Sequence, residues 1–424
     1  MLRAYKTELD PNNKQRTQLV RYCGVSRFVY NWALADRKAQ YEQGVSVSMY
    51  EQKKRFNALK DEQFPWVREV AYVVEESAFA NCDLAYKNFF RRVKSGVEKL
   101  GFPNFKSKKY GLGSFTLRGS VHVQSNTVQL PRLGIIRLKE DNYFPTSDVK
   151  ILSATVGEQA RHWFVSLQVE EPDKPVPQPG TGIIGVDVGI KTLATCSDGT
   201  VFENPKSLSR YEKRLTHISR ELSRRQKGSK NRAKTKQKVA KLHYRIANIR
   251  RYSLHQVSNY LAVKAKPETI VLEDLNVMGM LQNRHLSKAI ADASFAELRR
   301  QLEYKCSWYG VNLVVADRFY PSSKTCSSCS VKKPLLKLSE RTFVCESCGA
   351  VIDRDFNASL NLAKLGSSSL DLEPPNKRGL PVEGLNGIIF TGTDPAKQEP
   401  GNVERCVNPG LPYMGISTSG VKRG

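Results

Sequence analysis

The sequence lacks the features that direct a chain into or across a membrane. Among its 424 residues, no stretch approaches the roughly 18 consecutive apolar residues that a membrane-spanning helix requires. The first residues, MLRAYKTELDPNNKQR, contain no apolar segment of the kind found in a signal peptide. We therefore expect a cytoplasmic protein with no membrane partner.

Acidic residues are also scarce. The chain has 41 Asp and Glu against 67 Lys and Arg, a formal net charge of +26, and no acidic residue occurs between Leu222 and Pro267. This excess of positive charge favours a polyanionic partner, because binding releases counterions from phosphates. The 40% hydrophobic and 9% aromatic content is typical of a globular protein. Together these numbers predict a folded protein that binds DNA or RNA.

The cysteines do not form the pattern of a disulfide framework. Their number, nine, is odd, and four of them have the spacing C-x2-C-x15-C-x2-C: Cys326, Cys329, Cys345 and Cys348. Two tight turns at this spacing can present four thiolates to Zn²⁺ in a tetrahedron. Because cysteine would fill all four positions, we expect a structural zinc. The alternative is four unrelated buried cysteines.

Helical periodicity dominates the first hundred residues, and alternation replaces it afterwards. We expect one helix from the Asp-Pro pair to Gly24, a second from Ser26, and a third over 71–94, where aromatic residues mix with cations. The third helix could stack bases and bind phosphates, or it could simply have a solvated basic face. Short alternating segments over 102–170 predict a small β-barrel or sheet, and the proline-rich EPDKPVPQPG indicates a linker.

Three acidic residues follow the linker, each on a separate predicted element. Asp187 lies in the first of three consecutive strands, Glu273 ends the strand TIVLE, and Asp355 begins the last helix. Carboxylates that converge on one sheet edge repel one another unless cations lie between them. Two Mg²⁺ held there could hydrolyse a phosphodiester bond. This order of strands and helices fits the ribonuclease-H fold.

Several motifs, in their order, resemble the TnpB (OrfB) family of insertion-sequence proteins, relatives of the type V CRISPR effectors. They are GVSRFVYNWAL, AYKNFF, GIIGVDVGIKTLATCSDG, IVLEDLNV, FYPSSKTCSSCS and CESCGAVIDRDFNASLNLA, within residues 1–365. The resemblance implies an α/β (multidomain α+β) chain. Its expected parts are an N-terminal helical, helix-turn-helix-like domain with the start of the wedge (1–100), a β-barrel wedge domain (101–172), a linker (173–180), a RuvC-like, ribonuclease-H-like nuclease domain (181–320), an inserted zinc ribbon (321–350), the last RuvC motif (351–365) and a disordered tail (366–424).

The resemblance also assigns roles to the acidic residues. The first RuvC acid falls on Asp187 in GVDVG, and the second falls on Glu273 rather than on Asp274. The third stands two residues before the asparagine of a D-x-N motif, which selects Asp355 over Asp353. The implied cofactors are structural Zn²⁺ and catalytic Mg²⁺, for which Mn²⁺ could substitute. The presence of all three acids argues against an inactive member of the family.

Members of this family resemble RNA-guided DNA endonucleases, so the implied partners are a guide RNA from the transposon end and double-stranded target DNA in a bacterial or archaeal cell. We expect a monomer. The acid-free basic segment is expected to form a pair of helices that contacts nucleic acid through eight cations: Arg224, Arg225, Lys227, Lys230, Arg232, Lys234, Lys236 and Lys238. Two other functions stay open. One is a transposase that acts directly on transposon ends, and the other is a nuclease-inactive, guide-directed DNA-binding regulator.

Overall fold

The computed structural model describes residues 1–96, 101–145, 149–172, 175–337 and 339–370. The chain divides into two compact units, the first from Met1 to Lys174 and the second beginning at Pro175. The tail predicted to be disordered lies outside the described residues from 371 onward. In the described part of the chain, no helix combines the length and the apolar composition needed to cross a membrane.

The first unit has helices α1 (Asn13–Glu42), α2 (Met49–Gln63) and α3 (Tyr72–Lys94), with short 3₁₀ turns at Pro65–Glu69 and Lys108–Tyr110. We predicted that a helix would end at Gly24, and this is wrong because α1 continues through it. A glycine inside a helix costs about 1 kcal/mol relative to alanine. Burial of the neighbouring Tyr22, Cys23 and Val25 offsets that cost.

The same unit contains a seven-stranded antiparallel sheet in the order β2-β6-β7-β1-β5-β4-β3. Its strands are β1 (Leu2–Asp10), β2 (Ser114–Leu117), β3 (His122–Gln124), β4 (Thr127–Leu130), β5 (Gly134–Leu138), β6 (Lys150–Gln159) and β7 (His162–Glu170). The N-terminus therefore forms a central strand, which the long helix α1 follows. The order is linear, with β2 and β3 at its ends, so no ladder between these two strands closes the predicted barrel within the described residues.

The second unit contains a five-stranded sheet in the order β10-β9-β8-β11-β12. Its strands are β8 (Ile183–Asp187), β9 (Thr192–Cys196), β10 (Val201–Glu203), β11 (Thr269–Glu273) and β12 (Asn312–Ala316). The first three pair antiparallel, and β11 runs parallel to both β8 and β12. The three consecutive strands and the later strand that ends at Glu273 are those that the sequence predicts.

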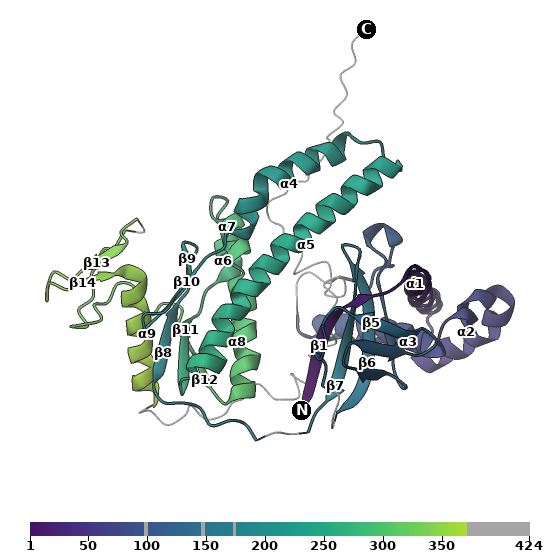
Figure 1. The fold of residues 1–424 in the computed structure, drawn as a ribbon, viewed down its shortest axis with the longest axis horizontal. Coiled ribbons are helices and arrows are strands. Elements are labelled where there is room, and N and C mark those ends of the chain that lie inside the picture. The colour runs from purple at the N-terminus through teal and green to yellow at the C-terminus, as the bar shows by residue number, and fades with distance from the viewer. Residues whose placement is uncertain (97–100, 146–148, 173–174, 338, 371–424) are drawn as a thin grey trace, which may run out of the picture. The chain divides into compact units, whose positions relative to one another are not determined.

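Helices cover both faces of this sheet (Figure 1). On one face, Ile270 and Leu272 of β11 join a core with α5 (Lys230–Asn259), its π-helical extension Tyr260–Ala265 and α8 (Phe295–Tyr309). On the other face, Val271 packs against Leu362 of α9 (Arg354–Leu370). The remaining elements are the helices α4 (Ser207–Arg224), α6 (Val277–Leu281) and α7 (Ser287–Ala293) and the hairpin β13 (Thr342–Val344) with β14 (Val351–Asp353). The helix α9 extends past Gly366, where we expected the tail to begin.

Candidate active site and metal centre

Two of the predicted acids lie side by side at one edge of the five-stranded sheet. Asp187 is the last residue of β8, and Glu273 is the last residue of β11. These strands are parallel neighbours, and Leu272 lies opposite Val186 in their register. The next residue along each strand is therefore one of the two acids, so both carboxylates lie at the carboxyl edge of the sheet.

The third acid reaches this edge because α9 lies unusually close to β8. A Cβ atom at Gly185 would lie 2.0 Å from the carbonyl oxygen of Ser359 and 2.4 Å from the amide nitrogen of Ala363, so only glycine fits there. Side chains two residues apart on a strand share a face, and Asp187 is therefore on the face that α9 covers. Asp355 is the second residue of that helix.

The electrostatics show that the three acids share one environment. Burial raises the pKa of Asp187 well above its usual value, and the negative charges of Glu273 and Asp355 raise it further. Burial likewise raises the pKa of Glu273, while a hydrogen bond from Ser322 and the positive charge of Arg354 act in the opposite direction. Neighbouring carboxylates make each other harder to ionise. Because divalent cations prefer oxygen ligands, such a group of carboxylates fits a divalent-cation site.

Two nearby acids have other partners. The carboxylate of Asp353 accepts hydrogen bonds from the backbone N–H groups of Asp355 and Phe356, both at 3.0 Å, so Asp353 caps the first turn of α9. Asp274, next to Glu273, is bound by Arg299 at 3.0 Å and by Arg318 at 2.7 Å. Its hydrogen bond with Arg318 is the main cause that lowers its pKa.

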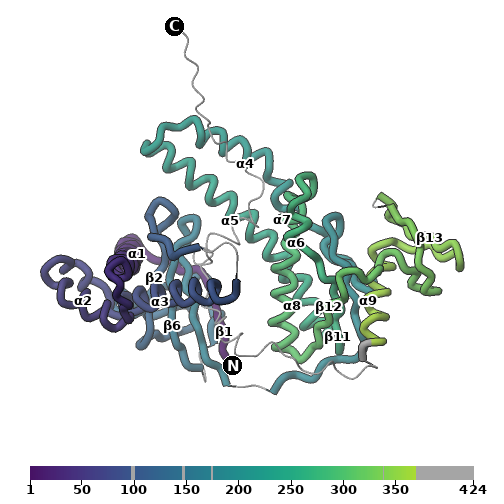
Figure 2. The backbone as a smooth tube through the Cα atoms, turned by 180° about the vertical axis from the view of Figure 1, so that it is seen from behind, coloured from purple at the N-terminus to yellow at the C-terminus, as the bar shows by residue number. Residues whose placement is uncertain are grey.

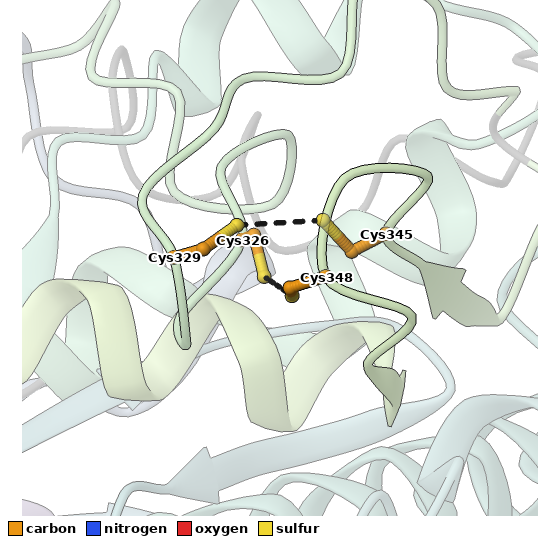
Figure 3. Close-up of side chains that lie close together, drawn as sticks. All are labelled: Cys326, Cys329, Cys345 and Cys348. Carbon is orange, nitrogen blue, oxygen red and sulfur yellow. Dashed lines mark hydrogen bonds between the residues drawn. The ribbon is translucent and has the colours of Figure 1, made fainter.

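The four cysteines of the predicted zinc site come together between two turns (Figure 3). All four sulfur atoms lie within 4.8 Å of one another, and within the described residues they are the one group of potential ligands packed this closely. The sulfur–sulfur distances are 3.7 Å for Cys326–Cys348 and 3.5 Å for Cys329–Cys345. A tetrahedral zinc site with Zn–S bonds of about 2.3 Å requires about 3.8 Å. The residues therefore fit Zn²⁺.

The turn around the first ligand favours a thiolate. Burial raises the pKa of Cys326, but backbone N–H groups of Cys329 and Ser328 lower it, and the net value is about 6. The other free cysteines of the described chain, Cys23, Cys82, Cys196 and Cys306, are all buried. Burial raises the pKa of Cys196 and Cys306 to about 12, so these thiols are unreactive.

The basic segment begins in the last turn of α4 and continues through α5, and these two helices lie side by side (Figure 2). A small core of Leu215, Ile218, Leu242 and Ile246 holds them together. Six of the eight candidate cations are exposed: Arg224, Lys227, Lys230, Lys234, Lys236 and Lys238. The other two stabilise the turn. Arg225 bonds Glu221, and Arg232 donates to the carbonyl oxygens of Leu222 and Arg225.

Sequence reasoning missed three residues near the acids: Gly185, Ser322 and Arg354. The close approach of α9 gives Gly185 its importance, and the SSKTC segment contains Ser322, whose hydroxyl donates to Glu273. Arg354 lies between Asp353 and Asp355 and lowers the pKa of both Asp187 and Glu273. Glycine between two buried strand residues was the one signal that could have indicated a close contact.

Family models match three parts of the chain. The OrfB_IS605 model, described as "Probable transposase", matches residues 166–284. A model of the Cas12f1-like TNB domain matches residues 295–362, which include the four cysteines. A model described as a helix-turn-helix domain matches residues 1–45, which here form β1 and α1.

Known proteins resemble nearly the whole chain. A Streptomyces pristinaespiralis protein named "Putative RNA-guided DNA endonuclease" is 35% identical over 408 residues, which cover 94% of this chain and 96% of that protein. Escherichia coli "Putative RNA-guided DNA endonuclease InsQ" is 31% identical over 403 residues, covering 90% and 96%. A solved complex of Cas12f1 with guide RNA and target DNA matches with a TM-score of 0.51 and 16% identity over 83% of each chain, a likeness of fold.

Proposed function

The chain belongs to the TnpB (OrfB) family of insertion-sequence proteins, and from that membership we propose that it is a transposon-associated, RNA-guided DNA endonuclease. The observation that supports this best is the 35% identity across almost the full length of a relative with that name. A second support is independent of the relatives. Three acids on separate elements share one electrostatic environment at the carboxyl edge of the sheet.

We assign the five-stranded sheet and its helices to a ribonuclease-H-like, RuvC-type nuclease domain. The strand order and the single helix α9 that closes over β8 support this assignment. Asp187, Glu273 and Asp355 would hold divalent cations, Mg²⁺ or Mn²⁺. When bound, these ions activate water and stabilise the leaving oxygen of a phosphodiester. The protein contributes the fixed positions of three carboxylates, and the nearby charge of Arg354 favours the ionised forms of Asp187 and Glu273.

Zinc in this proposal has a structural role. Cys326, Cys329, Cys345 and Cys348 would hold it, and four thiolates leave no coordination position for a substrate. The zinc ribbon interrupts the nuclease domain between β12 and α9, the element that carries Asp355.

The α4–α5 pair is the proposed contact for guide RNA or for the RNA–DNA heteroduplex. Its exposed cations can bind phosphates, whereas base pairing with the guide would read the sequence. Since backbone contacts are insensitive to sequence, one protein surface could serve any guide.

The test begins with protein purified together with its bound RNA, mixed with a plasmid that contains the guide-matched target and supplied with Mg²⁺. We expect cleavage that requires both Mg²⁺ and RNA and that Asp187→Ala abolishes. Cleavage that persists without RNA and yields a strand-transfer product would instead indicate a transposase. Guide-dependent DNA binding without cleavage by the native protein would indicate a regulator.

A further inference from the structure

The segment between β12 and the first zinc ligand reaches the acidic site. Ser322 is only 4% exposed, and its hydroxyl donates a hydrogen bond to the carboxylate of Glu273. A hydroxyl that donates to a carboxylate fixes the orientation of that carboxylate, and hydrogen bonds of this kind commonly orient metal-binding carboxylates. Ser322 is separated from Cys326 by only three residues, so the contact joins the predicted zinc site to the predicted nuclease site.

Two asparagines of α9 hold this segment. The side-chain amide of Asn361 donates to the carbonyl oxygens of Ser322 at 2.7 Å and of Thr325 at 2.6 Å. The amide of Asn357 also donates to the carbonyl oxygen of Thr325, at 2.7 Å. Both asparagines are buried, with 0% of the surface of Asn357 and 2% of that of Asn361 exposed. Buried amides are costly unless they are bonded, so these contacts fix one path for the backbone.

The first zinc ligand lies inside the same network. The backbone N–H of Ser327 donates to Asn357 Oδ1 at 2.9 Å, and Lys364 of α9 donates to the carbonyl oxygen of Ser327. The two residues that flank Cys326, Thr325 and Ser327, are therefore both hydrogen-bonded to side chains of α9. Movement of the cysteine turn would displace the carbonyl groups that Asn357 and Asn361 hold.

We propose that Ser322 is a positioning residue for Glu273, and that the zinc-bound turn at Cys326 fixes Ser322 through Asn357 and Asn361. This rests on the proposed function, in which Glu273 holds a divalent cation. The zinc ribbon then performs no chemistry itself but sets the affinity of the nuclease site for its metal.

A local readout of metal binding tests the proposal without measuring DNA cleavage. Fe²⁺ can be bound in place of Mg²⁺, and with ascorbate and peroxide it cuts the polypeptide next to the bound metal. The resulting fragments identify the metal site, even if the RNA binds iron elsewhere. The protein is the full chain with its co-purified RNA. In Ser322→Ala, we expect the Fe²⁺ concentration for half-maximal cutting near Glu273 to rise about 10–100-fold, as is usual when a residue that orients a metal ligand is removed.

A matched pair separates the hydroxyl from the shape of the side chain. Ser322→Thr keeps the hydroxyl and should retain an affinity near that of the native protein, whereas Ser322→Val has the same shape as the threonine variant and should behave like Ser322→Ala. Ser323→Ala, in the adjacent serine, is the control and should leave the iron titration unchanged. Equal affinities for the Thr and Val variants would overturn the positioning role.

The zinc link has its own measurement. Removing zinc from the native protein with a chelator should raise the half-maximal Fe²⁺ concentration as Ser322→Ala does, and Asn361→Ala should speed zinc release. In Ser322→Ala itself, zinc removal should add little further change, because the hydrogen bond that transmits the effect is already absent. A zinc-free protein with native iron affinity would refute the link. Absence of any cutting near the three acids in native protein would instead count against the proposed metal centre.

Discussion

At the scale of single residues, the two aspartates that flank Arg354 have different tasks. Asp353 caps α9 through two backbone N–H groups, and Asp355 contributes negative charge to the site of Asp187. We expect Asp355→Asn to lower the cleavage rate by about 10²–10³-fold, the cost of removing one group that stabilises a transition state electrostatically. Asp353→Asn should retain cleavage, because Asn and Asp are about equally good helix caps.

The measurement for this pair is single-turnover plasmid cleavage at saturating Mg²⁺, with melting temperatures recorded beside it. Asp353→Ala serves as the structural control: it should cost about 1 kcal/mol of stability and leave the cleaved product unchanged. Loss of cleavage in Asp353→Asn, with a native melting temperature, would contradict the division of roles.

The raised pKa of Asp187 predicts how stability depends on pH. Burial and the charges of Glu273 and Asp355 keep a proton on Asp187 at pH values where the unfolded chain has released it. This bound proton increases the free energy of unfolding at low pH, and its contribution is lost as the pH rises through the folded-state pKa of Asp187. Divalent cations bind the deprotonated carboxylate, so the melting-temperature increase caused by Mg²⁺ should grow with pH.

Differential scanning fluorimetry from about pH 5 to pH 8, with EDTA or with Mg²⁺, measures this dependence. Asp187→Asn removes the charge, so the metal-free variant should melt higher than the native protein at neutral pH and should lose most of the Mg²⁺ effect. A Mg²⁺ effect of equal size in the Asn variant would show that the ion acts elsewhere.

At the scale of elements, the α4–α5 pair contains exposed cations, which we propose bind RNA, and other cations that stabilise the fold. Lys227, Lys230 and Lys234 are exposed, whereas Arg232 bonds two carbonyl oxygens of the turn. Changing the three lysines to Gln should weaken RNA binding. The slope of log affinity against log salt should fall by about 0.7–0.9 for each phosphate that the variant no longer neutralises.

Filter binding of RNA at several salt concentrations gives that slope. Arg232→Gln provides the comparison, since it should lower thermal stability by about 1 kcal/mol through the loss of its hydrogen bonds and change the slope by less than the triple variant does. An unchanged slope in the triple variant, with native folding, would remove this surface from the RNA interface.

The pattern of apolar and polar residues predicted helices and strands well where residues close together in the sequence determine the structure. The strands ending at Asp187 and Glu273 follow from apolar runs that finish in an acid, and parallel pairing brings such ends together. The N-terminal strand β1 could not be foreseen, because it pairs with β7, more than 150 residues away. The contacts of Ser322 and Gly185 were hidden for the same reason: each depends on the path of α9.

At the scale of the whole molecule, the two proposed metal sites differ in kind. The predicted zinc site is closed, with four sulfurs within 4.8 Å, while the acids at the sheet edge offer oxygen ligands that repel one another until cations bind. Thiolates hold Zn²⁺ tightly and zinc binding contributes to folding, whereas carboxylates exchange Mg²⁺ readily. Removal of the two metals should therefore have separable consequences.

Brief EDTA treatment should abolish cleavage and leave the fold intact, and added Mg²⁺ should restore full activity. Prolonged treatment with a zinc-selective chelator should lower the melting temperature, and Mg²⁺ alone should not reverse this. Cys345→Ser should reproduce the zinc-depleted state, with less than about one zinc per chain by elemental analysis, while Cys306→Ser, at a buried cysteine outside the cluster, should keep its zinc. Native zinc content in Cys345→Ser would contradict the four-cysteine site, since a closed tetrahedral site needs every thiolate to complete its ligand set.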